Sequence, residues 1–349
     1  MSKSIVDSSQ SEFARLRPIP VDAVTLADSF WAPRIETNRT VTIPSQHAFL
    51  ESTGRVDNFR RASGRKTGIG FQGDWFFNDS DVYKWLEAAA WELACRPDAE
   101  LEALCDSVIE EIGAAQQPDG YLNTFFMFEK EKDRWTNIRD LHEMYCAGHY
   151  FQAAVAYYRA TDKTNPLDIA TRLADHIDRQ FPEEKPGACG HPECEMALVE
   201  LYRATGERRY LNLAERMIAA RGQKPALCGG GRYWQDHVPF KELKEVTGHA
   251  VRMLYLCSGA TDVVLETGDA ELKAALEAQF ENFTTRRMYV TGGAGSRWEG
   301  EAFGSDWELT SERAYTETCA AIASVMWCWR MLAAHRGIAL RGPYGAHAL

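Results

Sequence analysis

The sequence predicts an all-α protein whose helices form a toroid of helix pairs, an (α/α)6-like barrel with little sheet. Most long segments after residue 31 repeat their apolar residues about every 3.6 positions, the period of an amphipathic helix. The predicted helices occur in pairs that resemble one another, as 157–177 resembles 201–221. Links of unequal length separate the pairs, which disfavours a regular open array and favours a ring.

The remaining segments are assigned by the same pattern. Helices are expected over these segments: 81–94, 101–112, 143–160, 167–180, 194–204, 210–220, 247–265, 270–287 and 318–334. Residues 21–31 differ, because their apolar residues form strand-like stretches. The polar residues 1–20 end in Arg17-Pro18-Ile19-Pro20 and predict a flexible arm.

Composition and charge exclude several classes of protein. The 349 residues include 39 Lys and Arg against 50 Asp and Glu, a net charge of −11. Such an acidic chain is a poor binder of nucleic acid or of anionic membranes. The longest apolar run, 320–331, is too short to span a membrane and is interrupted by Arg330. The opening lacks an apolar core of signal-peptide length, and the nine scattered cysteines suit reduced thiols, so we expect a cytoplasmic protein.

Two motifs combine polar and aromatic residues in the links between predicted helices. Residues 70–81 read GFQGDWFFNDSD, and aromatic rings beside amides and carboxylates suit a sugar ligand. The alternative, which we favour for this motif alone, is a helix N-cap at Asp79 or Ser80 preceded by packed aromatics. The second motif, QQPDGYLNT at 116–124, is a helix end followed by a tight turn at Asp119-Gly120.

Three histidines lie close to predicted helix starts, namely His142, His191 and His249. A single histidine is more often a structural residue than a catalytic one. Three histidines at equivalent link-to-helix junctions of one toroid would, however, converge on its mouth. Cys189 and Cys194 flank His191, but no second Cys or His pair accompanies them, so buried thiols are expected there rather than zinc.

The link before the last predicted helix holds the strongest chemical signal. Its Gly-rich run at 292–295 lacks the spacing and the βαβ context of a dinucleotide site. Glu301 and Glu317 are a candidate carboxylate pair for acid–base chemistry. Cys319 lies near a helix start, where the helix dipole lowers a thiol pKa. Glu317 and Cys319 would point about 200° apart on a regular helix, so they can share a metal only if Glu317 lies at or before the cap.

The sequence resembles glycoside hydrolase family 127, the β-L-arabinofuranosidase family, from about residue 21 to about residue 336. The resemblance rests on several motifs in the same order: VTLADSFWAPRIETNRT, NDSDVYKWLEA, QQPDGYLNT, HEMYCAGH, GHPECEMALVELYRATG, VTGHAVRMLYL, GEAFGSDWEL and YTETCA. It implies an (α/α)6 catalytic barrel followed by β-sandwich domains. It also implies a retaining glycosidase that acts on a carbohydrate, an arabinofuranoside or a related sugar.

The resemblance further assigns residues to roles. Glu301 matches the general acid/base, and Glu317 and Cys319 match two ligands of a zinc ion. The sugar pocket would be lined by a further set: Gln46, His142, His191, His249 and Thr318. In the family the nucleophile is a zinc-bound cysteine of a later Cys-Cys-Pro-Pro-Asn motif, which this sequence does not contain.

The domain expectation follows from the missing motif. We expect a flexible arm at 1–20 and an (α/α)6-type catalytic domain at 21–349, truncated before the Cys-Cys motif and the β-sandwich domains. Two ligands of a four-ligand zinc site leave catalysis open. In the family the extended N-terminal segment packs on the β-sandwich, so Val24, Leu26 and Phe30 should be exposed, and a homo-oligomer is possible. Two alternatives stay open: a non-catalytic sugar-binding toroid and a sugar isomerase resembling N-acylglucosamine epimerase, which would use the histidines as acid and base.

Overall fold

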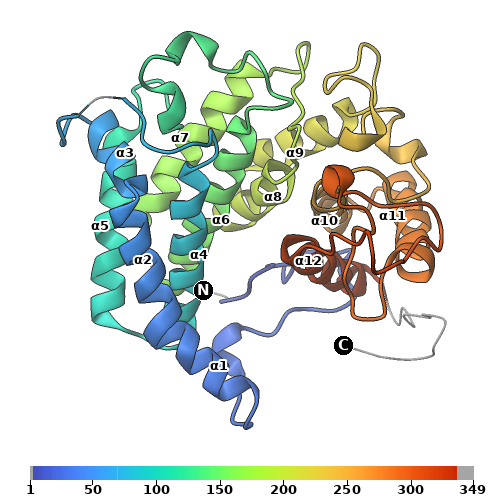
Figure 1. Cartoon of the computed structure of the whole chain (residues 1–349), viewed down its shortest axis with the longest axis horizontal. Helices are drawn as coiled ribbons and strands as arrows, with labels where there is room; N and C mark the ends of the chain where they lie inside the picture. Colours follow the sequence, from blue (N-terminus) through green and yellow to red (C-terminus); the bar gives the residue numbers. More distant parts are fainter. Residues whose placement is uncertain (1–2, 69, 336–349) are drawn as a thin grey trace.

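The computed structural model describes residues 3–68 and 70–335, which fold as helices joined by links (Figure 1). Within these ranges only isolated β-bridges occur and no strand forms. The α-helices are α1 Trp31–Thr37, α2 Ile43–Ser52, α3 Arg55–Ala62, α4 Asp79–Cys95, α5 Ala99–Ala115, α6 Glu143–Thr161, α7 Asn165–Gln180, α8 Cys194–Thr205, α9 Arg208–Ala220, α10 Ala250–Thr267, α11 Ala270–Asn282 and α12 Thr318–Ala334.

The α-helices form an inner and an outer layer, and their sequences decide which layer each joins. Along the inner layer α4 packs on α6, α6 on α8, α8 on α10, and α10 on α12. Almost every residue of α10 before Glu266 is buried, as expected for a helix enclosed on all sides. The outer helix α9 instead buries one stripe, which includes Tyr210, Ala214 and Met217, and turns its polar face outward.

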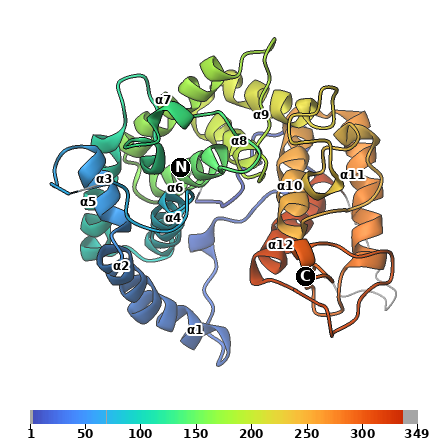
Figure 2. The same cartoon turned by 45° about the horizontal axis from the view of Figure 1, so that its top comes forward.

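The helix pairs follow an arc rather than a closed ring. In Figure 2 the arc runs from α2 through α6 and α8 to α12, with a gap between α1–α2 and α12 that no described helix occupies. The inner helices α4, α6, α8 and α10 run in the same sense, and each is followed by an outer return, as α8 is followed by α9. The predicted all-α architecture of helix pairs is therefore confirmed.

The predicted helices agree with the structure at nearly every segment from 81 onward. The π-helix Phe283–Arg287 continues α11, so the expected segment 270–287 is helical in two parts. The sequence missed three helices, α1 to α3, which are joined by the π-helix Asn38–Thr42. The cause is physical: α1 buries no residue and so has no apolar stripe to detect.

The N-terminal segment differs from the expected loose arm. Val6 is 3% exposed, and the backbone of Arg15 donates to Ala333 O of α12 at 2.7 Å. Residues 21–31 form no strand: the 3-10 helix Val21–Ala23 is followed by irregular chain up to α1. The composition of the N-terminal segment shows correctly that it is polar. It cannot show that the segment packs against helices more than 250 positions away in the chain.

Exposed apolar side chains follow this segment. Val24, Leu26 and Phe30 are 54%, 48% and 54% exposed, as the sequence predicted. An oligomer formed through them stays a prediction. Among the described helices, none combines the length and apolar character that crossing a bilayer requires.

Candidate functional site

The N-terminal ends of four inner helices carry most of the residues singled out by the sequence. The residues at these N-cap positions are His142 of α6, Glu193 of α8, His249 of α10 and Glu317 of α12. The ring centroids of His142 and His191 are 5.4 Å apart, and those of His191 and His249 are 5.5 Å apart. The three histidines therefore converge at one mouth, as their positions in the sequence predicted.

His142 is held as a neutral ring. Its backbone is left-handed, with φ of 55°, and its Nδ1 lies 2.6 Å from Asp140 O. Because a carbonyl oxygen only accepts, Nδ1 carries the proton and Nε2 keeps a free lone pair. Phe76 and Phe77 pack on the ring, and burial lowers the pKa of His142 to about 4. His142 can therefore accept a hydrogen bond from a ligand hydroxyl.

His191 is the central ring of the three. Tyr145 packs on it with ring centroids 4.7 Å apart, and Lys84 Nζ donates to Tyr145 Oη at 2.8 Å. Burial and the neighbouring His142 lower the pKa of His191 well below its usual value. Its Nδ1 is buried without a hydrogen-bond partner in the described chain. A buried polar atom without a partner is what a polar ligand can satisfy.

Glu301 is positioned by backbone contacts rather than by a helix. It has a left-handed backbone with φ of 52°, and the next residue, Ala302, forms antiparallel bridges to His249 and to Arg297. Gly295 of the Gly-rich run accepts from the backbone of both Tyr315 and Thr316, at 3.1 and 3.0 Å. The Gly-rich run therefore joins the Glu301 loop to the start of α12, and a strained backbone at such a point is typical of functional sites.

Glu301 and His249 form an acid–imidazole pair in the site. His249 Nε2 lies 3.0 Å from Glu301 Oε2, and His249 Nδ1 accepts from the backbone of Arg252. Burial lowers the pKa of His249 to about 3, so the ring is neutral and Nε2 carries its proton. Burial and the nearby Glu317 raise the pKa of Glu301. A carboxyl group with a raised pKa can hold a proton for transfer near neutral pH.

Glu317 lies at the N-cap of α12, which is the position it must have if it is to bind the same metal ion as Cys319. The two side chains are hydrogen-bonded, and Thr318 lies exposed between them. The predicted lowering of the Cys319 pKa is wrong. Burial and the bond to Glu317 raise that pKa to about 11, because a neighbouring carboxylate opposes the thiolate more than the helix dipole favours it.

Gln46 lies in an adjoining hollow of about 640 Å³. Its other lining residues are Ser45, Phe49, Leu50, Thr53, Arg55, Asp81, Lys84 and Trp85. Lys84 connects this hollow to the histidines, since it lines the hollow and also contacts Tyr145. Gln46 is therefore next to the histidine cluster, and it has no described contact with a histidine of that cluster.

Further carboxyl groups lie beneath the histidines. Glu193 is fully buried, and its Oε1 lies 3.4 Å from His149 Nδ1. Burial and the nearby Glu87 raise the pKa of Glu193 well above its usual value, and burial raises that of Glu87 to about 7. Neither of the His149 nitrogens nor Glu193 Oε2 has a hydrogen-bond partner in the described chain. The interior below the mouth is therefore polar and poorly satisfied.

The two link motifs of the sequence are mainly structural. Asn78, not Asp79 or Ser80, is the N-cap of α4. Asp79 is instead buried and accepts from Thr124 N at 2.6 Å, which joins the first motif to the second. In the second motif Gly120 has φ of 93°, a turn that glycine permits, and Tyr121 Oη donates to Glu143 Oε1 at 2.6 Å. Both motifs thus support the start of α6, where His142 lies.

The donors available to a metal are few in the described part of the chain. Cys189 and Cys194 are buried thiols, as expected, and burial raises the pKa of both. Over residues 3–68 and 70–335 no group of three or more His, Cys, Asp or Glu side chains is arranged to hold an ion. Glu317 and Cys319 adjoin each other but have no third donor among these residues.

Sequence reasoning missed three residues that the structure places in the site. Lys84 and Tyr145 lie within the family motifs NDSDVYKWLEA and HEMYCAGH. Tyr315 is hydrogen-bonded to Glu301 and belongs to YTETCA. Each lies on the exposed or mouth-facing side of its segment, and polar or amphipathic residues there were a signal that could have been used.

Comparison with known proteins agrees with this geometry. Residues 23–340 match the family model described as β-L-arabinofuranosidase, GH127 catalytic domain. The chain is 43% identical over 281 residues to a non-reducing end β-L-arabinofuranosidase of Bifidobacterium longum subsp. longum. This alignment covers 73% of this chain and 43% of the relative.

Two solved structures are also similar. A GH127 β-L-arabinofuranosidase from Geobacillus stearothermophilus T6 has a TM-score of 0.86 and 44% identity, and covers 88% of this chain and 52% of its own. A GH127 β-arabinofuranosidase, BT3674, has a TM-score of 0.87 and 38% identity, and covers 93% and 52%. This chain therefore spans about half the length of the relatives it matches. With a matched family model over residues 23–340 and a matched fold, the chain belongs to glycoside hydrolase family 127.

Proposed function

We propose that this chain is the acid–base part of a β-L-arabinofuranoside hydrolase, with Glu301 as the general acid. One observation carries the proposal: Glu301, with a raised pKa, contacts the neutral ring of His249 at 3.0 Å. A general acid must be protonated when the substrate binds and must reach the leaving oxygen. Burial and Glu317 favour the first condition, because both raise the pKa of Glu301.

His249 supports this role through its tautomer. Since its Nδ1 accepts from the backbone, its protonated Nε2 faces Glu301 Oε2 at 3.0 Å and favours one orientation of the carboxyl group. The protonated carboxyl group would donate its proton to the oxygen of the departing group. The Nε2–H dipole would then stabilise the carboxylate that forms when the proton leaves.

The sugar would lie against the histidine rings. His142 offers a lone pair at Nε2, and His191 offers a buried nitrogen without a partner. Gln46 would contact the sugar from the adjoining hollow, and Thr318 from the start of α12. Hydroxyl groups supply both donors and acceptors, so a furanoside can satisfy these atoms together.

The described residues do not fit a complete zinc site. A structural zinc takes about four protein ligands, and Glu317 and Cys319 supply two. The sequence contains no adjacent pair of cysteines. We therefore assign these two residues as partial zinc ligands only, derive no step through a metal, and assign no nucleophile in this chain.

Sugar binding without turnover is the second candidate. Two observations favour it: the described residues offer few metal ligands, and the histidine cluster contains buried nitrogens without hydrogen-bond partners. Binding would then need His191 and His249 but would not need the proton of Glu301.

An aryl β-L-arabinofuranoside assay tests the proposal. Glu301→Gln should lower kcat by about 10²- to 10⁴-fold, the usual contribution of a general acid. Glu299→Gln is the matched control, because Glu299 lies on the same 3-10 turn, pairs with Arg313 and should leave the rate unchanged.

The remaining outcomes separate the alternatives. Binding of the glycoside without release of the aryl group in the unmodified chain would favour the binding module. Epimerisation of a free sugar that depends on His142, His191 or His249 would favour the isomerase and contradict the hydrolase.

A further inference from the structure

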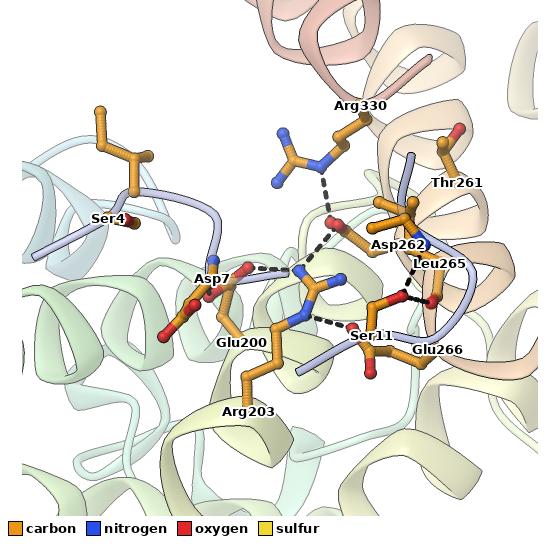
Figure 3. A network of polar contacts seen from close by, with 12 residues as sticks. Ser4, Asp7, Ser11, Glu200, Arg203, Thr261, Asp262, Leu265, Glu266 and Arg330 are labelled. Carbon is orange, nitrogen blue, oxygen red and sulfur yellow. Dashed lines mark hydrogen bonds and ion pairs between the residues drawn. The ribbon is translucent and has the colours of Figure 1, made fainter. Parts of the chain in front are cut away.

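A cluster of buried charges lies at the opposite ends of the four inner helices that begin at the site (Figure 3). Its members are Arg159 of α6, Glu200 and Arg203 of α8, Asp262 and Glu266 of α10, and Arg330 of α12. No side chain of the cluster is more than 9% exposed. Three guanidinium groups therefore face three carboxyl groups.

Asp262 is the centre of the cluster. One of its oxygens lies 2.9 Å from Arg203 Nη1 of α8, and the other lies 2.6 Å from Arg330 Nε of α12. Burial alone would raise the pKa of Glu200, but Arg159 and Arg203 lower it, so this carboxyl group is ionised. Each helix is thus joined to its neighbour by a buried ionic contact.

The N-terminal segment closes the cluster from outside. Arg159 Nη1 donates to the backbone oxygens of Ser4 and Ile5 at 3.0 and 3.2 Å. The backbone of Asp7 donates to Glu200 Oε2 at 3.5 Å, and Ser11 Oγ donates to Leu265 O of α10. Figure 3 shows the segment passing over the charged side chains. Residues 3–16 therefore act as a cover over this end of the helices.

The geometry connects the cluster with the site. Asp262 lies 13 positions after His249 on α10, and Arg330 lies 13 positions after Glu317 on α12. At 1.5 Å per residue this is about 20 Å along each helix. A helix is stiff over this length, and α10 packs on α12. A contact that holds their C-terminal ends together therefore limits the angle between the two helices, and with it the separation of their N-terminal ends.

We propose that Asp262 and Arg330, covered by residues 3–16, are positioning residues that set the distance between the start of α10, where His249 meets the Glu301 loop, and the start of α12, where Glu317 and Cys319 lie. Only the expected effect on sugar binding rests on the proposed function. The spacing of the helix ends is a property of the chain itself. Arg203 and Glu200 extend the same control to the histidines of α8 and α6.

Hydrogen exchange measures the helix ends directly, and Arg330→Met is the variant to test. It leaves Asp262 without its partner on α12, so amides in the first turns of α10 and α12 should exchange about tenfold faster or more. The outer helices α7 and α9 should keep their protection. Arg330→Lys keeps the charge and should restore most of the protection at the first turns.

Arg209→Met is the matched control, because Arg209 of α9 pairs with Asp175 of the neighbouring outer helix α7 at 2.9 Å. It should leave the first turns of α10 and α12 unchanged. If Arg330→Met fails to fold, Asp262→Asn/Arg330→Gln replaces the ionic contact by a neutral one and is read in the same way. Faster exchange spread equally over all helices, or unchanged first turns, would overturn the proposal.

A binding measurement with L-arabinose separates the two ideas. Weaker binding in Arg330→Met, with binding intact in Arg209→Met, is expected if both are correct. If the unmodified chain binds no arabinose or arabinoside, the proposed function fails, while the exchange experiment still decides the positioning role.

Discussion

The two ends of the inner helices differ in how well their buried polar side chains are paired. At the C-terminal ends every charged side chain of the cluster has an ionic partner, and Asp262 has two. At the N-terminal ends His149, His191 and Glu193 keep buried atoms without hydrogen-bond partners, and His142 and Glu301 hold left-handed backbones. The same helices therefore pair their charged side chains at one end, although Arg203 Nη2 lacks a partner there, and leave several polar groups unsatisfied at the other, where a ligand can bind.

The largest expected effect is at the paired end. Asp262→Ala leaves Arg203 and Arg330 facing each other without the carboxylate between them. The free energy of unfolding should fall by about 3–5 kcal/mol in urea denaturation, the usual cost of leaving a buried charge unpaired. Asp175→Ala, which breaks an exposed pair, should cost about 1 kcal/mol or less. Equal losses in the two variants would remove the distinction between the two ends.

The pH dependence of the free energy of unfolding tests the site end of the inner helices. His142 has a folded pKa of about 4 against a usual 6.5, so the unfolded chain binds the extra proton as the pH falls between these values. The ring therefore contributes stability above pH 6.5 that is lost toward pH 4, on the order of 1–3 kcal/mol. His142→Gln should flatten that acid-side slope in denaturation curves measured from pH 4 to 6.5.

The neighbouring Glu143 gives the opposite sign. Burial raises its pKa to about 7 from a usual 4.5, so the folded chain holds the extra proton and stability falls as the pH rises between these values. Glu143→Gln should therefore make stability rise more steeply with pH over this range. If His142→Gln and Glu143→Gln changed the slope of stability against pH in the same direction, the opposite pKa shifts assigned to the two residues would be contradicted.

A smaller effect is expected where a buried group has no partner. His191→Leu should leave the free energy of unfolding unchanged or raise it by up to about 1 kcal/mol, because it removes a desolvated nitrogen that bonds to nothing. Arabinose binding should weaken at the same time. The matched control is His176→Leu, since His176 bonds to Trp135 Nε1 and Asp119 O at 3.1 Å each. It should lose about 1–2 kcal/mol, and a larger loss at His191 than at His176 would show that His191 is satisfied.

The sequence predicted the site end far better than the paired end. His142, His191 and His249 lie at or just before the starts of predicted helices. In a ring of helix pairs every second helix starts at the same face, so equivalent positions in the pairs were enough to predict that the three meet. Arg203 and Asp262 stand within predicted helices too, but nothing local shows that they face each other, since their contact joins positions 59 apart in the chain. The segment 3–16 was missed for the same reason. A polar composition predicts exposure, whereas its burial depends on backbone contacts to distant helices.

The thiol of Cys319 shows a second limit. Its place at a helix start was a correct prediction, but its pKa depends on Glu317, whose side chain turns back to bond it from the N-cap. The family resemblance supplied the roles of Glu301, Glu317 and Cys319. Those roles stay predictions, and the geometry adds only that Glu301 meets His249 and that Glu317 meets Cys319.

The smallest expected effect is the removal of a possible metal ligand. A zinc site of about four ligands holds its ion tightly, whereas Glu317 and Cys319 are two, and zinc must also displace a proton from a thiol whose pKa is raised to about 11. After treatment with a chelator, addition of zinc and gel filtration, the chain should retain well under one zinc per molecule. Cys319→Ala should retain the same low amount and keep its free energy of unfolding. One zinc per molecule that is lost in Cys319→Ala would show instead that this chain, or a second copy of it, completes the site with donors beyond these two.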